Sequence, residues 1–424
     1  STLWPHMWSL DSRNVLVNGK KVTTYNFQLE RNLLDLGVGV LSHEMFHSLG
    51  APDLYHYSLD EMNPVASWDL MENTTNPPQH MGAYMKYRYG HWITSIPEIS
   101  NAGTYYLQPL NSSKQNSFRI ASPNSSSEYY VLEYRKQQGV FEKSLHSEGL
   151  LVYRINQNSD GQGNAVVVSD EAYIYRPGGT NSSNGEPDKA SFSSNSGRTA
   201  INDYSNPSSV LSDNLPGGLD LYEVGSLSDS ISFKIRKPKA YTLALTSPTG
   251  GENFKINGQT NITWINTSVS DIKIELSLDS VRWQEITTVK GQSGVNQGQF
   301  LWKIPSQPTT TGKIRISDLN DASSYSLSRN FFTISTNGQL FEVEPNNTKA
   351  EATPIARGDS FEGNIDPEGE ADYYKFTASA GDTIDVFAGG VNSTLRGRIL
   401  ILNDASILGF DDGLYNGLIT NQRF

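Results

Sequence analysis

Two histidines, a glutamate and an aspartate stand close together in one stretch of the sequence, Ser42-His-Glu-Met-Phe-His-Ser-Leu-Gly-Ala-Pro-Asp-Leu-Tyr55. Residues four apart lie on the same face of a helix, so His43 and His47 are expected to reach one metal ion at about 2.0 to 2.1 Å. Gly50 is expected to break the helix and let the chain turn back. Asp53 then becomes available as a third ligand, through a carboxylate oxygen.

This ligand set predicts a catalytic metal site. Three protein ligands and one open water position are typical of catalytic zinc sites, whereas structural zinc sites close with four ligands. Zinc acidifies a water molecule and polarises a carbonyl group, and Glu44 is expected to take the proton and return it to the leaving amine. The predicted reaction is hydrolysis of a peptide bond. The simpler alternative is that both histidines lie on a helix surface and that Asp53 only caps a turn.

Two helices are predicted to position these groups. The first runs from about Leu33 to Leu49, because its apolar residues cluster on one face: Leu34, Val38, Leu41, Met45 and Leu49. This face is expected to pack on the core, so that His43 and His47, which lie opposite, look into a cleft. The second helix is expected from about His80 to Tyr89.

The rest of the sequence is predicted to be mostly β structure. A length of 424 residues suggests three or four domains. Short alternating runs such as Gly149-Leu-Leu-Val-Tyr-Arg-Ile155 are typical of strands, and the polar interval 181–214 is expected to be a long surface loop. The expected fold class is multidomain, with an α+β catalytic part at residues 1–97 and all-β sandwich modules at 98–238, 239–336 and 337–424.

Charge and residue types exclude several kinds of partner and site. A net charge of -12 would repel a phosphate backbone, so no nucleic acid partner is expected. The sequence contains no run of 18 apolar residues, so no transmembrane segment is expected. It has no cysteine, so a metal site must use His, Asp and Glu. A chain that starts at Ser1 without Met is expected to be a processed product or a fragment.

The stretch around His43 and Asp53 resembles the zinc-binding sequence of the immune inhibitor A family of bacterial metallopeptidases, which are metzincin-like. Three further segments resemble the Met-turn, the helix after it and a strand near the cleft of that family: Trp68-Asp-Leu-Met71, the stretch from His80 to Trp92, and Leu3-Trp-Pro-His-Met-Trp8. The resemblance covers about residues 1–235. It implies a secreted bacterial zinc endopeptidase that acts on protein or peptide substrates.

The same resemblance implies roles for single residues. It implies His43, His47 and Asp53 as zinc ligands, Glu44 as general base, and Met71 as a hydrophobic floor beneath the metal.

The chain departs from the family in two places. Family members normally have a further stretch of catalytic domain before the equivalent of Leu3, so the catalytic domain is expected to lack its N-terminal portion. Asn73 stands two residues after Met71, where some metzincins carry a tyrosine. No oxyanion-stabilising residue is therefore assigned.

The later modules show two further resemblances. Ser247-Pro-Thr-Gly-Gly-Glu252 resembles part of the small immunoglobulin-like modules of secreted proteins, and residues 342–376 resemble the start of the bacterial pre-peptidase C-terminal domain, here truncated. These modules are expected to bind a surface or polymer target and so raise the local concentration of the enzyme there.

Several polar residues outside the main cluster also have expected roles. Hard oxygen ligands suited to a structural Ca²⁺ occur at Asp170-Glu171, Asp404 and Asp411-Asp412. Asp69 is expected to brace the Met-turn. Three other histidines are expected on the surface: His56, His80 and His91.

Two other classes of function compete with the peptidase. The alternative is a secreted binding or adhesion protein that keeps a non-catalytic zinc site. The presence of Glu44 argues against it, because such a site needs no base. A glycoside hydrolase would need a carboxylate pair across a sugar cleft, and nothing in the sequence points to one.

Overall fold

The computed structural model describes residues 4–10, 12–57, 62–165, 169–322, 324–336, 338–356, 361–363, 371–379, 382–388, 399–402, 407–411 and 417–423. Strands account for 35% of the residues and helices for 9%, which confirms the predicted predominance of β structure. The chain divides into two compact units, one formed by Ser1–Ile256 with Asn261–Gly338 and the other by Asn257–Thr260 with Gln339–Phe424. Among the described residues, no helix is long and apolar enough to cross a membrane.

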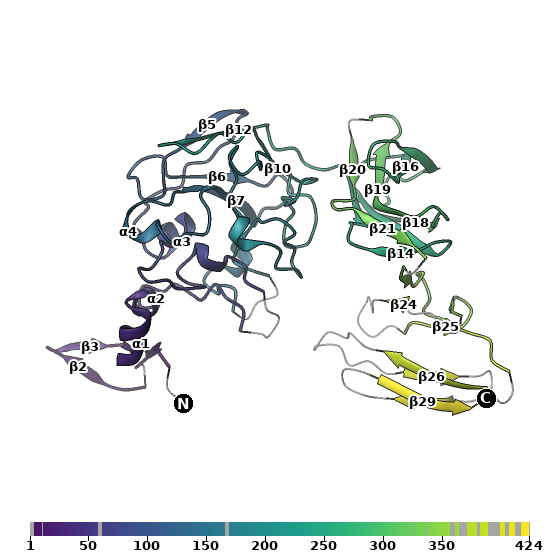
Figure 1. Ribbon diagram of the computed structural model, residues 1–424, viewed down its shortest axis with the longest axis horizontal. Helices are drawn as coiled ribbons and strands as arrows, with labels where there is room; N and C mark the ends of the chain where they lie inside the picture. Colours follow the sequence, from purple (N-terminus) through teal and green to yellow (C-terminus); the bar gives the residue numbers. More distant parts are fainter. Residues whose placement is uncertain are drawn as a thin grey trace. The chain divides into compact units, whose positions relative to one another are not determined.

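Two four-stranded sheets organise the first part of unit 1 (Figure 1). The sheet nearer the predicted metal site contains β6 (Ser117–Ala121), β7 (Glu128–Arg135), β8 (Gly149–Asn156) and β9 (Ala172–Ile174), in that order. The other contains, in order, β10 (Ile201–Asn202), β11 (Asp220–Tyr222), β12 (Ile231–Ile235) and β5 (Gly103–Leu107). All neighbouring pairs are antiparallel. Alternating runs in the sequence predict strands at residues 103–107, 117–120, 129–134, 149–155 and 230–235, and each of these strands is confirmed within a residue or two.

Strand β7 is buried on both of its faces. Side chains alternate along a strand, so Tyr130 and Leu132 point into the core between the two sheets, whereas Val131 points the opposite way. On that opposite face, Val131 joins a second core with Tyr153 of β8, and this core includes side chains from residues 46–89. The segment that contains the predicted metal ligands thus packs directly on the sheet.

The interval 181–214 is less exposed than expected. It contains the short helix η3 (Pro187–Lys189) and strand β10, and Phe192 and Ile201 have no exposed surface. Phe192 also exchanges backbone hydrogen bonds with Leu150 of β8, at 2.8 and 2.9 Å. The prediction of a surface loop is wrong for these residues, because two apolar side chains in a polar segment are enough to anchor it to the core.

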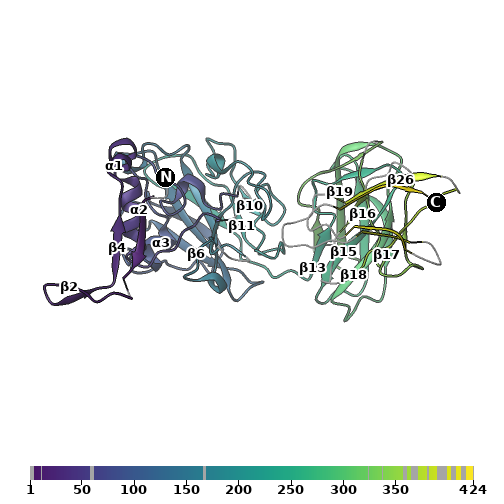
Figure 2. The same ribbon diagram turned by 90° about the horizontal axis from the view of Figure 1, so that it is seen from below.

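Before this sheet, the chain forms short elements at one edge of the unit. Strands β1 (His6–Ser9) and β4 (Thr24–Phe27) pair with each other, as do β2 (Val15–Val17) and β3 (Lys20–Val22). The helices and 3₁₀ turns of the unit are α1 (Glu30–Leu36), α2 (Gly39–His47), η1 (Ala66–Trp68), α3 (Ala83–Arg88), α4 (Gly139–Glu142) and η2 (Gln157–Ser159), besides η3. In Figure 2, α1, α2 and β4 lie along one side of the unit.

The single helix expected from Leu33 to Leu49 is two helices, and that prediction is wrong. Gly37 ends α1 with φ of +68°, a conformation that L side chains rarely adopt. A Cβ atom on Gly37 would also lie 2.2 Å from the side chain of Asn76. The helix expected from about His80 to Tyr89 corresponds to α3, which begins at Ala83, three residues later than expected.

The orientation of α2 also differs from the prediction. Val38, Met45 and Leu49 of the apolar face are 52%, 56% and 53% exposed, whereas His43 and Phe46 on the other side are buried. The Phe46 ring stacks on Trp92 with ring centroids 5.4 Å apart. Helical periodicity shows which residues share a face, but it does not show which face finds a partner. In α2, the face that carries His43 packs against the rest of unit 1. Among the described residues, the apolar face remains largely exposed.

The second part of unit 1 is a further pair of sheets. One has the order β13 (Leu243–Ser247), β15 (Gln259–Asn266), β18 (Gln297–Lys303). The other has the order β14 (Asn253–Lys255), β21 (Phe332–Ser335), β19 (Thr309–Asp318), β16 (Ile272–Ser277), β17 (Gln284–Val289), and β20 (Tyr325–Leu327) pairs with β19. Trp264 and Trp302 are buried in this part. Alternating runs in the sequence also predict strands around residues 261–264, 272–276, 300–304 and 313–316, and these strands are present.

Unit 2 consists of paired short strands in its described residues. Two pairs are parallel, β22 (Leu340–Phe341) with β24 (Phe361–Glu362) and β23 (Thr353–Pro354) with β25 (Tyr374–Lys375). Two pairs are antiparallel, β26 (Thr383–Ala388) with β29 (Gly417–Arg423) and β27 (Ile399–Leu402) with β28 (Ile407–Asp411). The domain boundaries expected at residues 97, 238 and 336 stay predictions.

Candidate metal centre

Helix α2 brings His43 and His47 to one point. Their rings lie 4.8 Å apart between centroids and are nearly perpendicular, at 88°. Nε2 of His43 lies 3.0 Å from Oδ1 of Asp53, and Nε2 of His47 lies 3.3 Å from the same oxygen. The three residues that were expected as ligands therefore meet, with one ligand atom from each within 4.8 Å of the others.

The hydrogen bonds of the two rings decide which nitrogen carries the proton. Nδ1 of His43 is 2.8 Å from the carbonyl oxygen of Leu70, and Nδ1 of His47 is 2.7 Å from that of Ala51. A carbonyl can only accept, so both Nδ1 atoms must donate. In a neutral ring, Nε2 is then the lone-pair nitrogen, so two lone pairs and a carboxylate oxygen of Asp53 face one another. Such a cluster requires a cation or additional protons.

Charge effects in the cluster agree with this need. Burial lowers the pKa of His47, but its hydrogen bonds to Asp53 and to the Ala51 carbonyl outweigh burial and raise the pKa above its ordinary value. Burial raises the pKa of Asp53, but its contacts with His43 and His47, which donate to it only when their rings are protonated, and the hydrogen bond from Tyr57 outweigh burial and lower that pKa well below the ordinary range. Asp53 is therefore a carboxylate that attracts positive charge.

The distances from Asp53 to the two histidine nitrogens fit zinc. Two ligands at about 2.1 Å from a tetrahedral ion lie roughly 3.4 Å apart. The distances of 3.0 and 3.3 Å from Asp53 Oδ1 to the two Nε2 atoms are close to this value. The backbone carbonyls on both Nδ1 atoms are also the usual outer partners of metal-binding histidines. The donor set of His43, His47 and Asp53 thus suits Zn²⁺ in both type and spacing.

The turn after α2 positions Asp53. Gly50 has φ of +95° and donates its N–H to the carbonyl of His47 at 2.8 Å, so it ends the helical path as predicted. The N–H of Leu54 donates to the carbonyl of Met71 at 2.9 Å, and the N–H of Asn164 donates to the carbonyl of Asp53 at 2.9 Å. Asp53 is therefore held between the segment around Met71 and the loop before β9.

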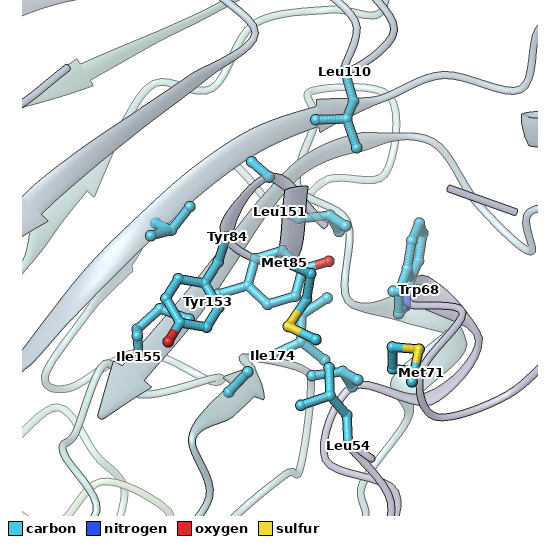
Figure 3. Close-up of a cluster of buried hydrophobic side chains, with 14 of the residues drawn as sticks. Leu54, Trp68, Met71, Tyr84, Met85, Leu110, Leu151, Tyr153, Ile155 and Ile174 are labelled. Atoms are coloured by element: carbon cyan, nitrogen blue, oxygen red, sulfur yellow. The ribbon is translucent and has the colours of Figure 1, made fainter. Parts of the chain in front are cut away.

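The segment Trp68 to Met71 lies beside the ligands, but it contacts them through its backbone. The carbonyl of Leu70 accepts from His43, as described above. The Met71 side chain has no exposed surface and belongs to the hydrophobic core. Figure 3 shows it in the part of the cluster that also contains Leu54 and Trp68. The expectation that Met71 forms a floor directly beneath the metal stays a prediction.

Asp69 braces this turn, as expected. Its Oδ1 accepts from the N–H of Met71 at 2.9 Å, and its Oδ2 accepts from the N–H of Gly82 at 2.6 Å. Burial raises the pKa of Asp69 to about 6. Arg135 of β7 adds a bond from the sheet, since its Nη1 donates to the carbonyl of Trp68 at 2.6 Å. The turn is thus fixed by polar groups on both sides.

Glu44 lies beside the ligand group without joining it. Its side chain is buried, with 7% of the residue exposed. Its negative charge contributes to the raised pKa values of His47 and Tyr55. Glu44 is thus close to the candidate ligands, and its role as a base that does not bind the metal stays a prediction.

Two tyrosines lie near Asp53 that the sequence did not identify as part of the site. The Tyr57 hydroxyl donates to Oδ2 of Asp53 at 2.5 Å. The Tyr55 ring lies 6.4 Å from that of His43 and 5.4 Å from that of Tyr57. Burial raises the pKa of Tyr55 to about 12. The only signal in the sequence is that both follow Asp53 closely, and this spacing does not reveal which way their rings point.

The remaining polar predictions have mixed outcomes. His56 is not a free surface histidine, because its Nε2 lies 2.7 Å from Oδ1 of Asp170. Glu171 accepts from the hydroxyls of Tyr84 and Tyr89, at 2.7 and 2.5 Å. The Asp170-Glu171 pair is thus engaged with protein groups, and the calcium site expected there stays a prediction.

His80 and Asn73 also have defined surroundings. His80 is only part-exposed, and burial lowers its pKa to about 4. His91 is exposed, with φ of +53°. Asn73 donates through Nδ2 to Ser67 Oγ at 3.0 Å. Leu3, Asp404 and Asp412 lie outside the described residues.

A second group of acidic side chains lies in unit 2. Carboxylate oxygens of Glu342, Glu344 and Asp372 lie within 4.8 Å of one another. Asn346 is fully buried beside them and donates through Nδ2 to Glu342 Oε2 at 3.2 Å. These are oxygen donors of the kind that calcium prefers. They are not the acidic residues that the sequence suggested for calcium.

Comparisons with known proteins give little further guidance. No family model matches the chain, and no curated protein matches its sequence. A superoxide reductase (neelaredoxin) from Ignicoccus hospitalis is similar in structure with a TM-score of 0.18 and 12% identity, over 22% of this chain and 81% of that one. A β-1,2-glucanase from Parabacteroides distasonis has a TM-score of 0.14 and 9% identity, over 56% of this chain and 38% of its own. Both TM-scores are too low to carry an argument about fold or function.

Proposed function

We propose that this chain carries the site of a zinc-dependent endopeptidase, with His43, His47 and Asp53 as ligands and Glu44 as general base. The main support is the convergence of two lone-pair nitrogens on Asp53 Oδ1, at 3.0 and 3.3 Å, while carbonyls occupy both Nδ1 hydrogens. The alternative of surface histidines and a turn-capping Asp53 explains neither this convergence nor the burial of His43.

The groups around the cluster support hydrolysis. Zinc, when bound, supplies a Lewis acid that polarises a carbonyl and acidifies a water. Asp53 is already engaged by both histidines and Tyr57, and Tyr55 keeps its proton at neutral pH because its pKa is about 12. Among the described side chains nearest the ligands, Glu44 is therefore the group left to accept a proton from water and to return it to the leaving amine.

Several finer predictions belong to the same proposal. The resemblance to the immune inhibitor A family motivates a metzincin-like α+β catalytic part, a peptide or protein substrate, and secretion from a bacterium. The sheets after Lys237 are proposed to position the enzyme on a surface or polymer target. The adhesion-protein alternative shares the zinc site and differs only in lacking cleavage.

Metal analysis and a cleavage assay on the natural full-length protein test this proposal. Glu44→Gln should keep one equivalent of zinc but lose cleavage of casein by about 100-fold or more, because general base catalysis contributes that much. His47→Ala should lose both zinc and cleavage, since two ligands hold zinc weakly. Zinc in the wild type without any cleavage would favour the adhesion protein. Full zinc occupancy in His47→Ala would show that the ligand set is wrong.

A further inference from the structure

The two oxygens of the Asp53 carboxylate have different partners. Oδ1 faces His43 and His47, whereas Oδ2 accepts the Tyr57 hydroxyl at 2.5 Å. Asp53 is 8% exposed, so water has little access to either oxygen. The hydroxyl of Tyr57 therefore determines which oxygen remains available for a cation.

The hydroxyl of Tyr57 reaches Oδ2 of Asp53 from a largely exposed side chain. The residue is 58% exposed, so burial of the ring does not hold the side chain in place. The backbone is fixed instead, because the N–H of Tyr57 donates to the carbonyl of Ala165 at 3.1 Å. The Tyr55 ring lies alongside at 5.4 Å. A well-placed backbone and a neighbouring ring thus aim an otherwise exposed hydroxyl at Oδ2 of Asp53.

This arrangement has a consequence for metal binding. A free carboxylate can bind a metal through one or both oxygens and can rotate between these modes. A hydroxyl bonded to Oδ2 withdraws that oxygen and fixes the plane of the carboxylate. Oδ1 is then presented alone, at tetrahedral spacing from the two Nε2 atoms.

We propose that Tyr57 is a positioning residue of the metal centre, which acts through Asp53 by holding Oδ2 so that Oδ1 binds as a single ligand atom. Outer groups that orient metal ligands typically change metal affinity by about 10 to 100-fold when they are removed. The proposal rests on the metal site proposed above and adds to it a residue that sequence patterns did not identify.

The test compares zinc affinity in Tyr57→Phe with that in the wild type, by competition with a chromophoric chelator. We expect about 10 to 100-fold weaker zinc binding in Tyr57→Phe, because Oδ2 is released while the ring is kept. Tyr87→Phe is the matched control. It removes the hydroxyl of another exposed tyrosine, on α3, and should leave the affinity unchanged.

Two further readouts separate positioning from a general effect on folding. The Co²⁺-substituted Tyr57→Phe variant should absorb more weakly in the visible range, because a bidentate Asp53 would raise the coordination number above four. In the Asp53→Ala background, Tyr57→Phe should cause no further loss of zinc affinity, because its effect passes through Asp53. Far-ultraviolet circular dichroism of the metal-free variants checks that they are folded.

The outcomes distinguish this inference from the proposed function. Equal zinc affinity in Tyr57→Phe and the wild type overturns the role of Tyr57 and leaves the zinc site standing. An equal loss from Tyr57→Phe with and without Asp53 shows that the effect is not transmitted through the ligand and also overturns it. If the wild type binds no zinc, the proposed function and this inference fail together.

Discussion

Arg135 links the β sheet to the turn beside the metal ligands, and replacing it should weaken both. Its side chain has no exposed surface. Nε and Nη2 donate to the two oxygens of Glu142 at 2.6 and 2.7 Å, and Nη1 donates to Glu133 at 3.1 Å and to the Trp68 carbonyl at 2.6 Å. One guanidinium therefore pairs with two buried carboxylates and holds the backbone of the turn.

The expected loss in Arg135→Met follows from these contacts. Methionine keeps much of the apolar stem but leaves Glu133 and Glu142 buried without their cation. Breaking a buried ion pair costs about 3 to 5 kcal/mol, and an unpaired buried carbonyl at Trp68 costs about 1 to 3 kcal/mol. The sum is about 4 to 8 kcal/mol. The Lys86 ammonium, which interacts with the same carboxylates, should keep the loss near the lower end of this range.

Urea unfolding, followed by circular dichroism, measures this loss against a matched control. Arg119→Met breaks an ion pair of Arg119 with Glu98 at 2.6 Å, but these side chains are 47% and 40% exposed, so the cost should be at most about 1 kcal/mol. Zinc affinity should fall only in Arg135→Met, because Leu70 of the braced turn holds His43. Equal destabilisation by the two substitutions, or unchanged zinc affinity in Arg135→Met, would refute the reasoning.

Three further predictions address pH, calcium and the later modules. Burial raises the pKa of Glu72 from 4.5 to about 8 in the folded protein. As the pH rises, Glu72 therefore loses its proton at a lower pH in the unfolded chain than in the folded one, and the free energy of unfolding falls between pH 4.5 and pH 8. Relative to the wild type, Glu72→Gln should therefore gain stability between pH 5 and pH 8 in chemical unfolding, and a constant difference would contradict the raised pKa. If the acidic group of Glu342, Glu344 and Asp372 in unit 2 binds calcium, Ca²⁺ at 100 times its Kd should stabilise that unit by about 2.7 kcal/mol. Glu344→Gln should remove this effect, and an unchanged Tm of the wild type in Ca²⁺ would exclude the site. Removing residues 241–424 should leave cleavage of a short peptide similar while weakening action on an insoluble target, and loss of peptide cleavage in a folded, zinc-containing protein would show that the modules form part of the active site.

Patterns of local spacing in the sequence agree with the structure. Alternation of side chains located β5 to β8 and β12 closely, because a period of two is set by the backbone itself. The approach of His43, His47 and Asp53 could also be anticipated, since one helical turn and one glycine turn define it. Their role as zinc ligands stays a prediction.

Features that depend on distant partners could not be anticipated. The exposed position of Met45 depends on which face of α2 finds a partner, and the sequence of the helix does not contain this information. The aim of the Tyr57 hydroxyl depends on Ala165, more than a hundred residues later. The break at Gly37 coincides with close packing against Asn76, which helical periodicity does not report.

The position of Asp53 between two distant segments affects the order of events during synthesis. The backbone of Asp53 is held by Asn164 and that of the next residue, Leu54, by Met71, and the adjoining core includes Ile174 of β9. About 120 residues separate Asp53 from Ile174. At roughly 5 to 20 residues per second, the ligand segment leaves the ribosome about 6 to 24 s before β9. Throughout that interval the proposed zinc ligands have no scaffold, so metal capture by them is expected to follow closure of the sheet rather than to start the folding of the chain.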